Sequence, residues 1–235
     1  MYDKVLTDPY DLKTNFTVKT YDNREKWFKG RSNKTIGASD AGIILGVNPY
    51  QTNKDLFKAK MNPKVEDDKQ MNDAMRYGTD AEEPLRRLFE LTYPRYHVHY
   101  RDHTTLRSKK RKFMTYSPDG LLYDIHTDKY GIYEGKTAQV NSRQAELQWN
   151  NRIPDYYFTQ LLHAMEVTGF DFAILNVELR RVRTIGNEEV ITFERRMYRY
   201  ERDNYENDIE YLIAEEERFM DYLSKGEEPP LIINI

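Results

Sequence analysis

The feature that most constrains the fold is a run of short strand-like segments enclosed between two helical ones. The strand-like segments, which alternate apolar and polar residues or form short apolar runs, are 97–106, 112–117, 120–125 and 131–138. A helical pattern occupies about 70–91 before them, and another occupies about 155–168 after them, where Gly169 ends it. A sheet covered by helices is therefore expected.

The outer parts of the chain extend this pattern. Further helices are expected at 23–29, at 39–46, after a cap at Thr52 or Asn53, and at about 203–223. A strand pair is expected at 171–180 and 188–200, around the turn signal Ile185-Gly186-Asn187. This order predicts an α/β fold of the mixed α+β kind, in which a central mixed β-sheet is flanked by helices.

Composition limits the class of protein. The 235 residues carry a net charge of −3 and include no cysteine, which excludes disulfides, thiolate zinc sites and thiolate-held iron–sulfur clusters. No apolar run approaches the roughly 18 residues of a membrane span, and the N-terminus lacks the pattern of a secretory signal. We therefore expect a cytoplasmic protein with one domain over 1–235, helical at about 1–94 and built of a sheet and helices at about 95–235.

Three charged residues form a candidate site: Asp119, just before the segment 120–125, and Glu134 and Lys136 in the segment 131–138. Glu134 and Lys136 are two apart on an expected strand, so their side chains share a face. A turn centred between Thr127 and Asp128 would set Asp119 opposite Lys136, with Glu134 as the diagonal neighbour. A slip of one residue would move Asp119 to the other face.

Such a constellation suits a metal ion. Two carboxylates on one sheet face repel each other unless a cation lies between them, and an all-oxygen site favours Mg²⁺, for which Mn²⁺ can substitute. Lys136 could hold the attacking water or help to deprotonate it, a chemistry that suits phosphodiester hydrolysis. The alternative is that Asp119 and Glu134 are surface charges of a hairpin and that Lys136 is their salt-bridge partner.

A third acid comes from the helical pattern at about 70–91. Leu85 and Phe89 mark its apolar face, and the spacing places Glu82 on that face, where a carboxylate needs a partner or a metal. Glu83 instead lies in line with Arg87, as a favourable exposed pair. We therefore predict that Glu82 points inward and is the third candidate ligand, the alternative being a boundary glutamate that reaches solvent.

Five blocks of the sequence together resemble a known family. In order they are WFKGRSNKTIGASDAGIILGVNPY at 27–50, GTDAEE, SPDGLLYD, EGKTA and YYFTQLLHAMEVTG. They are similar to the YqaJ/lambda-exonuclease family of phage recombination nucleases, in the PD-(D/E)xK superfamily. The resemblance covers about 27–169 and implies a restriction-endonuclease-like core.

The resemblance also implies roles for single residues. Asp119 and Glu134 would bind the metal with the backbone carbonyl of Gly135, Glu82 would complete the surroundings of a second ion, and Lys136 would orient or activate the water.

Further roles concern the DNA itself. Gln160 would lie near the reacting phosphate, with Tyr157 one turn before it, although from the residues alone both read as the polar edge of a packed helix. In the family, the region of Arg31 and Ser39 grips a 5′-phosphate, but one extra residue between them makes Arg31 the weaker match, and Ser39 also reads as a plain N-cap. The basic run RSKKRK at 107–112, with Lys109, Lys110 and Arg111 at its centre, is expected to contact the duplex backbone, or else to form a solvated loop.

These features predict a Mg²⁺-dependent exonuclease that degrades one strand of linear duplex DNA, 5′ to 3′. The resemblance implies 3′ single-stranded tails for recombination by strand annealing, a single-strand annealing recombinase as partner, a ring-shaped homotrimer, and a phage or prophage origin with action inside a bacterial host. Two alternatives stay open. One is a structure-specific endonuclease of the same superfamily, and the other is a non-catalytic module that binds DNA ends or protein.

Overall fold

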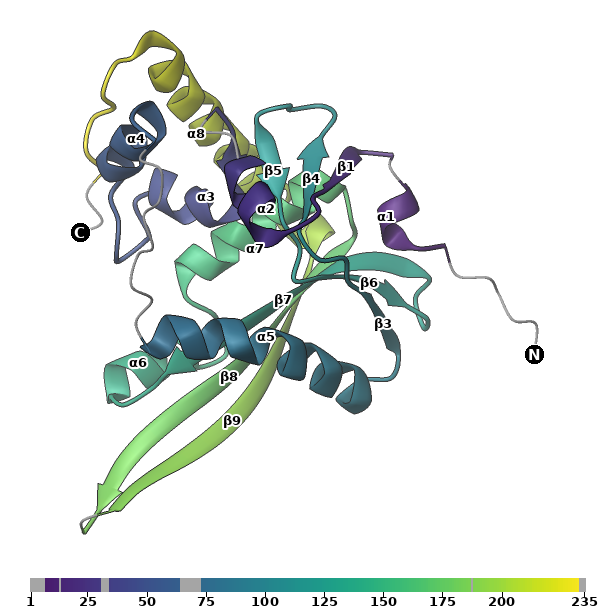
Figure 1. Ribbon diagram of the computed structural model, residues 1–235, viewed down its shortest axis with the longest axis vertical. Helices are drawn as coiled ribbons and strands as arrows, with labels where there is room; N and C mark the ends of the chain where they lie inside the picture. Colours follow the sequence, from purple (N-terminus) through teal and green to yellow (C-terminus); the bar gives the residue numbers. More distant parts are fainter. Residues whose placement is uncertain (1–6, 13, 31–33, 64–72, 187, 233–235) are drawn as a thin grey trace.

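The computed structural model describes residues 7–12, 14–30, 34–63, 73–186 and 188–232 (Figure 1). The helices are α1 (Pro9–Leu12), α2 (Arg24–Gly30), α3 (Ala38–Ile44), α4 (Asn53–Met61), α5 (Asp73–Thr92), α6 (Arg143–Leu147), α7 (Asp155–Thr168) and α8 (Glu206–Lys225), with a 3-10 turn η1 (Arg202–Asn204). The strands are β1 (Phe16–Thr20), β2 (Ile36–Gly37), β3 (Tyr96–His99), β4 (Thr104–Ser108), β5 (Met114–Tyr116), β6 (Gly120–Asp124), β7 (Lys129–Gln139), β8 (Phe172–Ile185) and β9 (Glu188–Glu201).

The larger sheet is five-stranded and mixed, in the order β3-β6-β7-β8-β9. Neighbouring strands are antiparallel except β7 and β8, which are parallel because α6 and α7 form the crossover between them. Helix α5 lies on one face, where Phe89 packs with Tyr96, Tyr133 and Phe172. Helix α7 covers the opposite face (Figure 1). The expected mixed sheet flanked by helices is confirmed.

The smaller sheet has four strands in the order β1-β4-β5-β2. Its inner face carries Phe16, Leu106, Met114 and Tyr116, which join the main hydrophobic core beneath α7. Because successive residues of a strand point to opposite faces, the residues between them form a polar outer face. Helix α7 therefore contacts both sheets and links them.

Local signals explain where the helices begin and end. Thr52 caps α4 by accepting a hydrogen bond from the Asp55 amide, and Asp55 accepts one from Thr52 in return. Helix α7 ends at Gly169, which has a φ of +69°, and α8 ends at Gly226 with the same φ. No helix of the described part of the chain has both the length and the apolar character needed to cross a bilayer.

Three expectations about the elements were wrong. The N-terminal part is not wholly helical, since β1 and β2 complete the smaller sheet. The segment 97–106 is two strands in different sheets, because His103 adopts a left-handed φ of +48° and turns the chain between β3 and β4. The pattern also missed the short helices α1 and α6.

Candidate active site

Asp119 and Glu134 meet where β6 and β7 begin to separate. The ladder pairs Gly120 with Tyr133, so its register sets Asp119 opposite Glu134 rather than opposite Lys136 as predicted. The predicted turn was one residue too far along the chain, a shift that moves the partner by two residues and keeps Asp119 on the same face. Oδ2 of Asp119 accepts a hydrogen bond of 3.1 Å from the amide of Gly135.

Glu134 lies at the centre of the site, with only 2% of its surface exposed. Its Oε1 accepts a hydrogen bond of 2.6 Å from Nζ of Lys136 and another from Nε2 of Gln160, and its Oε2 accepts one of 3.1 Å from the hydroxyl of Tyr116. Strands β5 and β7 and helix α7 thus each supply a contact to one buried carboxylate. Nζ of Lys136 also lies 5.6 Å from the ring centre of Tyr157.

The charges of the site shift one another's pKa. Burial and then the negative charge of Asp119 raise the pKa of Glu134 to about 7. Burial opposes the charged form of Lys136, but Glu134 and Asp119 outweigh it and raise its pKa well above the usual range. Lys136 is therefore a stable cation beside the two acids, and it donates a hydrogen bond to Glu134.

Glu82 is exposed on α5 and is not buried on the apolar face as predicted, which agrees with the alternative of a boundary glutamate that reaches solvent. Its carboxyl group nevertheless belongs to the electrostatics of the site. Partial desolvation and the charge of Asp119 raise its pKa, while Lys136, Arg24 and Arg86 act in the opposite direction. The predicted exposed pair on the same helix is confirmed, with 2.6 Å between Glu83 and Arg87.

The donor set is suited to a hard divalent ion. Asp119 and Glu134 offer carboxylate oxygens, and the pKa of Glu134 is raised by burial first and by the charge of Asp119 second, both of which a bound cation would offset. Within the described residues, no three His, Asp or Glu side chains form a preformed metal cage. Mg²⁺ fits such a site, because it is commonly held by one or two carboxylates with water and substrate phosphate as the other ligands.

A pocket of about 230 Å³ adjoins the carboxylates, over the polar outer face of the smaller sheet. Its floor comes from alternate residues of three strands: Thr17 and Lys19 of β1, Thr105 and Arg107 of β4, and Thr115 of β5, with Ser117 just beyond β5. Helix α2 stands over this floor, where the indole nitrogen of Trp27 donates to the hydroxyl of Thr105 over 3.1 Å. Gln160 lines the pocket and also donates a hydrogen bond to Glu134, so its side chain connects the pocket with the carboxylates.

The pocket is cationic and rich in hydroxyls. Lys19 and Arg107 contribute positive charge, and none of its described lining residues is acidic. Ser39 lines it as the second residue of α3, so it is not the N-cap, which is Gly37. Asp40 is turned to its own helix, where it accepts from the Gly37 amide over 2.9 Å and pairs with Lys60 over 2.8 Å. Arg31 lies outside the described residues.

Comparison with known proteins identifies the family. The model of the YqaJ-like viral recombinase domain matches residues 26–171, which is more than half of the chain. The chain belongs to this family. This confirms the family predicted from the five sequence blocks.

Two kinds of relative support the assignment. The uncharacterized protein YqaJ of Bacillus subtilis (strain 168) is 26% identical over 151 residues, which are 64% of this chain but only 44% of that protein. The fold is shared with an alkaline exonuclease (LHK-Exo) from Laribacter hongkongensis, at a TM-score of 0.58 and 20% identity over 86% of this chain and 97% of that one. The same exonuclease in complex with dAMP matches over the same shares, at a TM-score of 0.55 and 19% identity. These matches confirm the predicted restriction-endonuclease-like fold.

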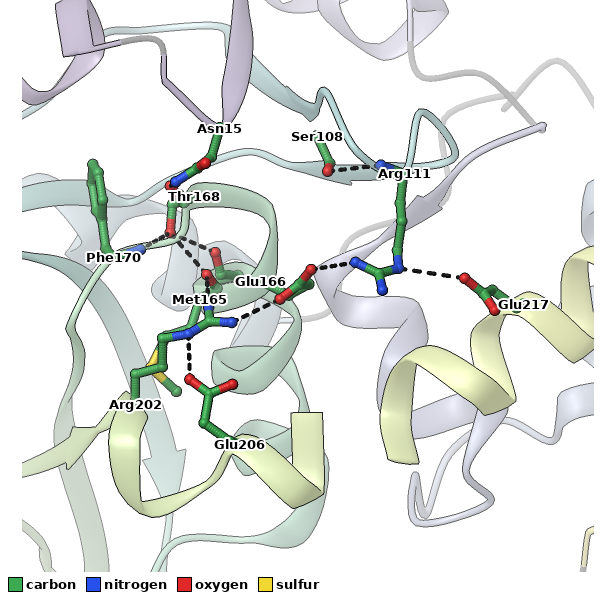
Figure 2. A network of polar contacts seen from close by, with 11 residues as sticks. Asn15, Ser108, Arg111, Met165, Glu166, Thr168, Phe170, Arg202, Glu206 and Glu217 are labelled. Atoms are coloured by element: carbon green, nitrogen blue, oxygen red, sulfur yellow. Dashed lines mark hydrogen bonds and ion pairs between the residues drawn. The ribbon is translucent and has the colours of Figure 1, made fainter. Parts of the chain in front are cut away.

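The basic run of this YqaJ-like domain is only partly available to DNA. Arg111 pairs with Glu166 of α7 over 2.5 Å and with Glu217 of α8 over 3.4 Å, and Arg202 binds the other oxygen of Glu166 over 2.8 Å (Figure 2). Arg111 thus links the loop between β4 and β5 to α7 and α8, and its contact with DNA stays a prediction. Lys109 and Lys110 line a separate hollow of about 350 Å³ near the same network.

Sequence reasoning missed three residues of the candidate site. Tyr116 donates a hydrogen bond to Glu134 from a strand that was predicted. It was missed because a tyrosine at an apolar position of an alternating strand is expected to be a core residue. Lys19 and Arg107 escaped because β1 was not predicted and Arg107 was read as part of a basic run. Only the pairing of β1 with β4 shows that these two cations share one face.

Proposed function

We propose that this YqaJ-like domain is a divalent-metal-dependent nuclease that hydrolyses one strand of linear duplex DNA from its 5′ end. It would leave 3′ single-stranded tails for recombination by strand annealing. The observation that carries the proposal is the position of Gln160, which links the carboxylate centre to a cationic pocket of a size suited to a terminal phosphate.

Asp119, Glu134 and the carbonyl of Gly135 would hold Mg²⁺, with Glu82 near enough to influence a second ion from the open side. When bound, the metal polarises a phosphoryl oxygen and stabilises the charge that develops on it. Burial and the charge of Asp119 both disfavour the ionised form of Glu134, and a bound cation would favour it.

The chain's own residues orient the reactants. Lys136 stays protonated beside two acids, which favours a role in holding the attacking water and the developing negative charge over a role as the base. Tyr116 and Gln160 fix the carboxylate of Glu134 from two elements, so that its orientation does not depend on the metal alone.

The pocket would receive the 5′-phosphate. Lys19 and Arg107 supply the positive charge, and Ser39 and Ser117 supply hydroxyl donors. The carboxylate of Asp40, next to Ser39, is already paired with Lys60 over 2.8 Å, which reduces its repulsion of a phosphate. Arg31 remains a proposed contact on the resemblance alone.

We also propose a ring-shaped homotrimer that works with a single-strand annealing recombinase. The support within the chain is the long hairpin of β8 and β9, which projects beyond the body (Figure 1). The hairpin also exposes large apolar side chains. Ile191 is 40% exposed and Phe193 is 53% exposed, and both lie on one face of the hairpin. Such residues are expected to be covered in an assembly.

The decisive experiment compares linear duplexes carrying a 5′-phosphate or a 5′-hydroxyl with a covalently closed circle, each incubated with Mg²⁺. We expect loss of the linear DNA only, faster with the 5′-phosphate, and a loss of activity of about 100- to 1,000-fold in Lys136→Ala. EDTA should abolish the activity. Cutting of the circle would favour a structure-specific endonuclease, and binding without metal-dependent cutting would favour a non-catalytic module.

The pocket has its own test. Lys19→Ala should raise KM for 5′-phosphorylated ends by roughly 10- to 150-fold, since a charge-assisted contact is worth about 1.5–3 kcal/mol. It should leave the rate on 5′-hydroxyl ends nearly unchanged. Lys26→Ala is the matched control, because Lys26 lies on α2 and pairs with Asp22 over 2.5 Å at the surface. Equal effects of the two variants on both substrates would contradict a phosphate pocket.

A further inference from the structure

Tyr50 is the most exposed of the large apolar or aromatic side chains in the described part of the chain. It follows α3 in the loop that leads to α4, and 85% of its surface is accessible. Most of its ring is therefore free to contact a ligand, at a position where burial would remove considerable apolar area from water.

This ring is connected to the carboxylate centre by a row of aromatic contacts. Tyr50 meets Tyr156 of α7 with ring centres 6.2 Å apart and planes at 78°, and Tyr156 lies 4.3 Å from Tyr157. The ring of Tyr157 then faces Nζ of Lys136 at 5.6 Å. A ligand on Tyr50 is thus three side-chain contacts away from the proposed reacting phosphate.

The loop holds Tyr50 in place before any ligand arrives. Oδ1 of Asn48 accepts hydrogen bonds from the amides of Tyr50 and Gln51, over 2.8 and 3.1 Å, and closes a tight turn. The amides of Val47 and Asn48 both donate to the carbonyl of Gly42. The turn thus fixes the backbone at Tyr50, so a ligand that binds the ring does not have to order the loop.

The other end of the row is equally fixed. A Cβ on Gly42 would lie only 2.9 Å from Cβ of Tyr156, so α3 and α7 approach each other closely at this point because Gly42 has no side chain. Tyr156 therefore has a firm support behind it. Tyr50 and Tyr156 form a rigid aromatic corner beside the site.

We propose that the Tyr50–Tyr156 corner is a stacking site for an unpaired nucleobase of the DNA end. An unpaired base offers a flat apolar face, and exposed aromatic side chains bind such bases whatever their sequence. A base inside a duplex is covered on both faces by its neighbours, so the corner is open only to a base at the strand end, and a base that has separated from its partner can reach it most freely. The proposal rests on the nuclease function proposed above, since it takes DNA as the substrate.

The test uses 5′-phosphorylated duplexes that carry 2-aminopurine in turn at each of the first few positions of either strand. Binding is measured by fluorescence in Ca²⁺, and cleavage of the same duplexes is measured separately in Mg²⁺. With the wild-type chain we expect quenching at one position near the end. Tyr50→Ala should lose that quenching and bind the frayed end on the order of 10-fold more weakly, whereas Tyr50→Phe and Tyr50→Trp should retain both.

Tyr211→Ala is the matched control, because Tyr211 is 61% exposed on α8, away from the row of rings. Quenching and binding unchanged in Tyr50→Ala would overturn the stacking site and leave the nuclease proposal intact. A Tyr50→Phe chain as weak as Tyr50→Ala would also overturn it, because the hydroxyl rather than the ring would then be responsible. A wild-type chain that neither binds nor cuts DNA would overturn both proposals.

Discussion

At the residue scale, the site depends on one carboxylate that is costly to bury. Glu134 is surrounded by Tyr116, Lys136 and Gln160 and stands beside Asp119. A buried acid with a second acid nearby resists ionisation, and a cation reverses that preference. The arrangement therefore favours the binding of a metal ion, and it lowers the stability of the metal-free chain.

This cost predicts a pH dependence of stability. The folded pKa of Glu134, about 7, lies above its ordinary value of 4.5, so the stabilising contribution is complete below about pH 4.5 and is lost as the pH rises through about 7. In EDTA, the free energy of unfolding of the wild type should fall relative to that of Glu134→Gln by up to about 3 kcal/mol between pH 4.5 and 8.5. Urea unfolding at both pH values measures it, and two parallel pH curves would contradict it.

The sequence predicted the acids and the lysine of the site because a strand has a strict period of two. Glu134 and Lys136 therefore had to share a face. The residue that lies opposite Asp119 depends instead on the position of the turn. The turn itself was not predictable, because a left-handed Asp128, with a φ of +58°, closes a four-residue loop between Asp124 and Lys129. The prediction that Glu82 is buried failed for another reason. Helix periodicity gives the direction of a side chain, but whether a neighbouring element covers that side chain depends on the tertiary structure.

At the element scale, a buried pair ties three elements together behind the site. His163 and Glu216 are both fully buried, with 2.7 Å between Nδ1 and Oε1, and Nε2 of His163 lies 3.0 Å from the carbonyl of Thr115. A carbonyl only accepts, so Nε2 carries a proton. Burial opposes a charged imidazole, but Glu216 outweighs it and raises the pKa of His163. Helices α7 and α8 and strand β5 are joined one turn beyond Gln160.

Removing the imidazole should therefore weaken the whole arrangement. His163→Ala leaves the carboxyl group of Glu216 buried without its partner, which costs about 3–5 kcal/mol when the acid stays charged. We expect the free energy of unfolding to fall by about that amount at pH 8 and by less at pH 5, where Glu216 can take up a proton. Urea unfolding tests this, with His97→Ala at an exposed position of β3 as control. Equal stability of the two variants would show that the pair carries no such role.

Elements were predictable where their boundaries carry their own signal, and not otherwise. Helix α7 was predicted to the residue, because Asp155 follows Pro154 and Gly169 stops the helix. Strand β1 was missed because FTVKT is short and its partner β4 lies far along the chain, a pairing that no local pattern contains. The pocket floor depends on that pairing, so the sequence could not predict it.

At the scale of the whole molecule, the β8–β9 hairpin extends past the body of the protein (Figure 1). Its register pairs Val182 with Ile191, which places both on the same face as Phe193. The body of the chain leaves these side chains at least partly uncovered. A lone ribbon with an apolar face is a poor structure in water, which is why we assign it to the proposed assembly.

Charge at this surface should disperse the assembly. The double variant Ile191→Lys, Phe193→Lys is expected to sediment as a monomer at concentrations where the wild type sediments as a trimer, because two lysines cannot be buried at low cost in an apolar contact. Analytical ultracentrifugation measures this, with Arg183→Lys on the opposite face as control. A monomeric wild type would contradict the trimer, and a trimeric double variant would place the contact elsewhere.

The position of Gln160 has a consequence for what the protein would release. The side chain touches both the carboxylate centre and the pocket, so the space between them is short. A strand whose terminal phosphate fills the pocket can then offer only its next phosphodiester to the carboxylates. Helix α7, which carries Gln160, would thus set the distance from the strand end to the cut at one nucleotide. The first products of digestion should be mononucleotides rather than short oligomers, and chromatography of the earliest time points would test this.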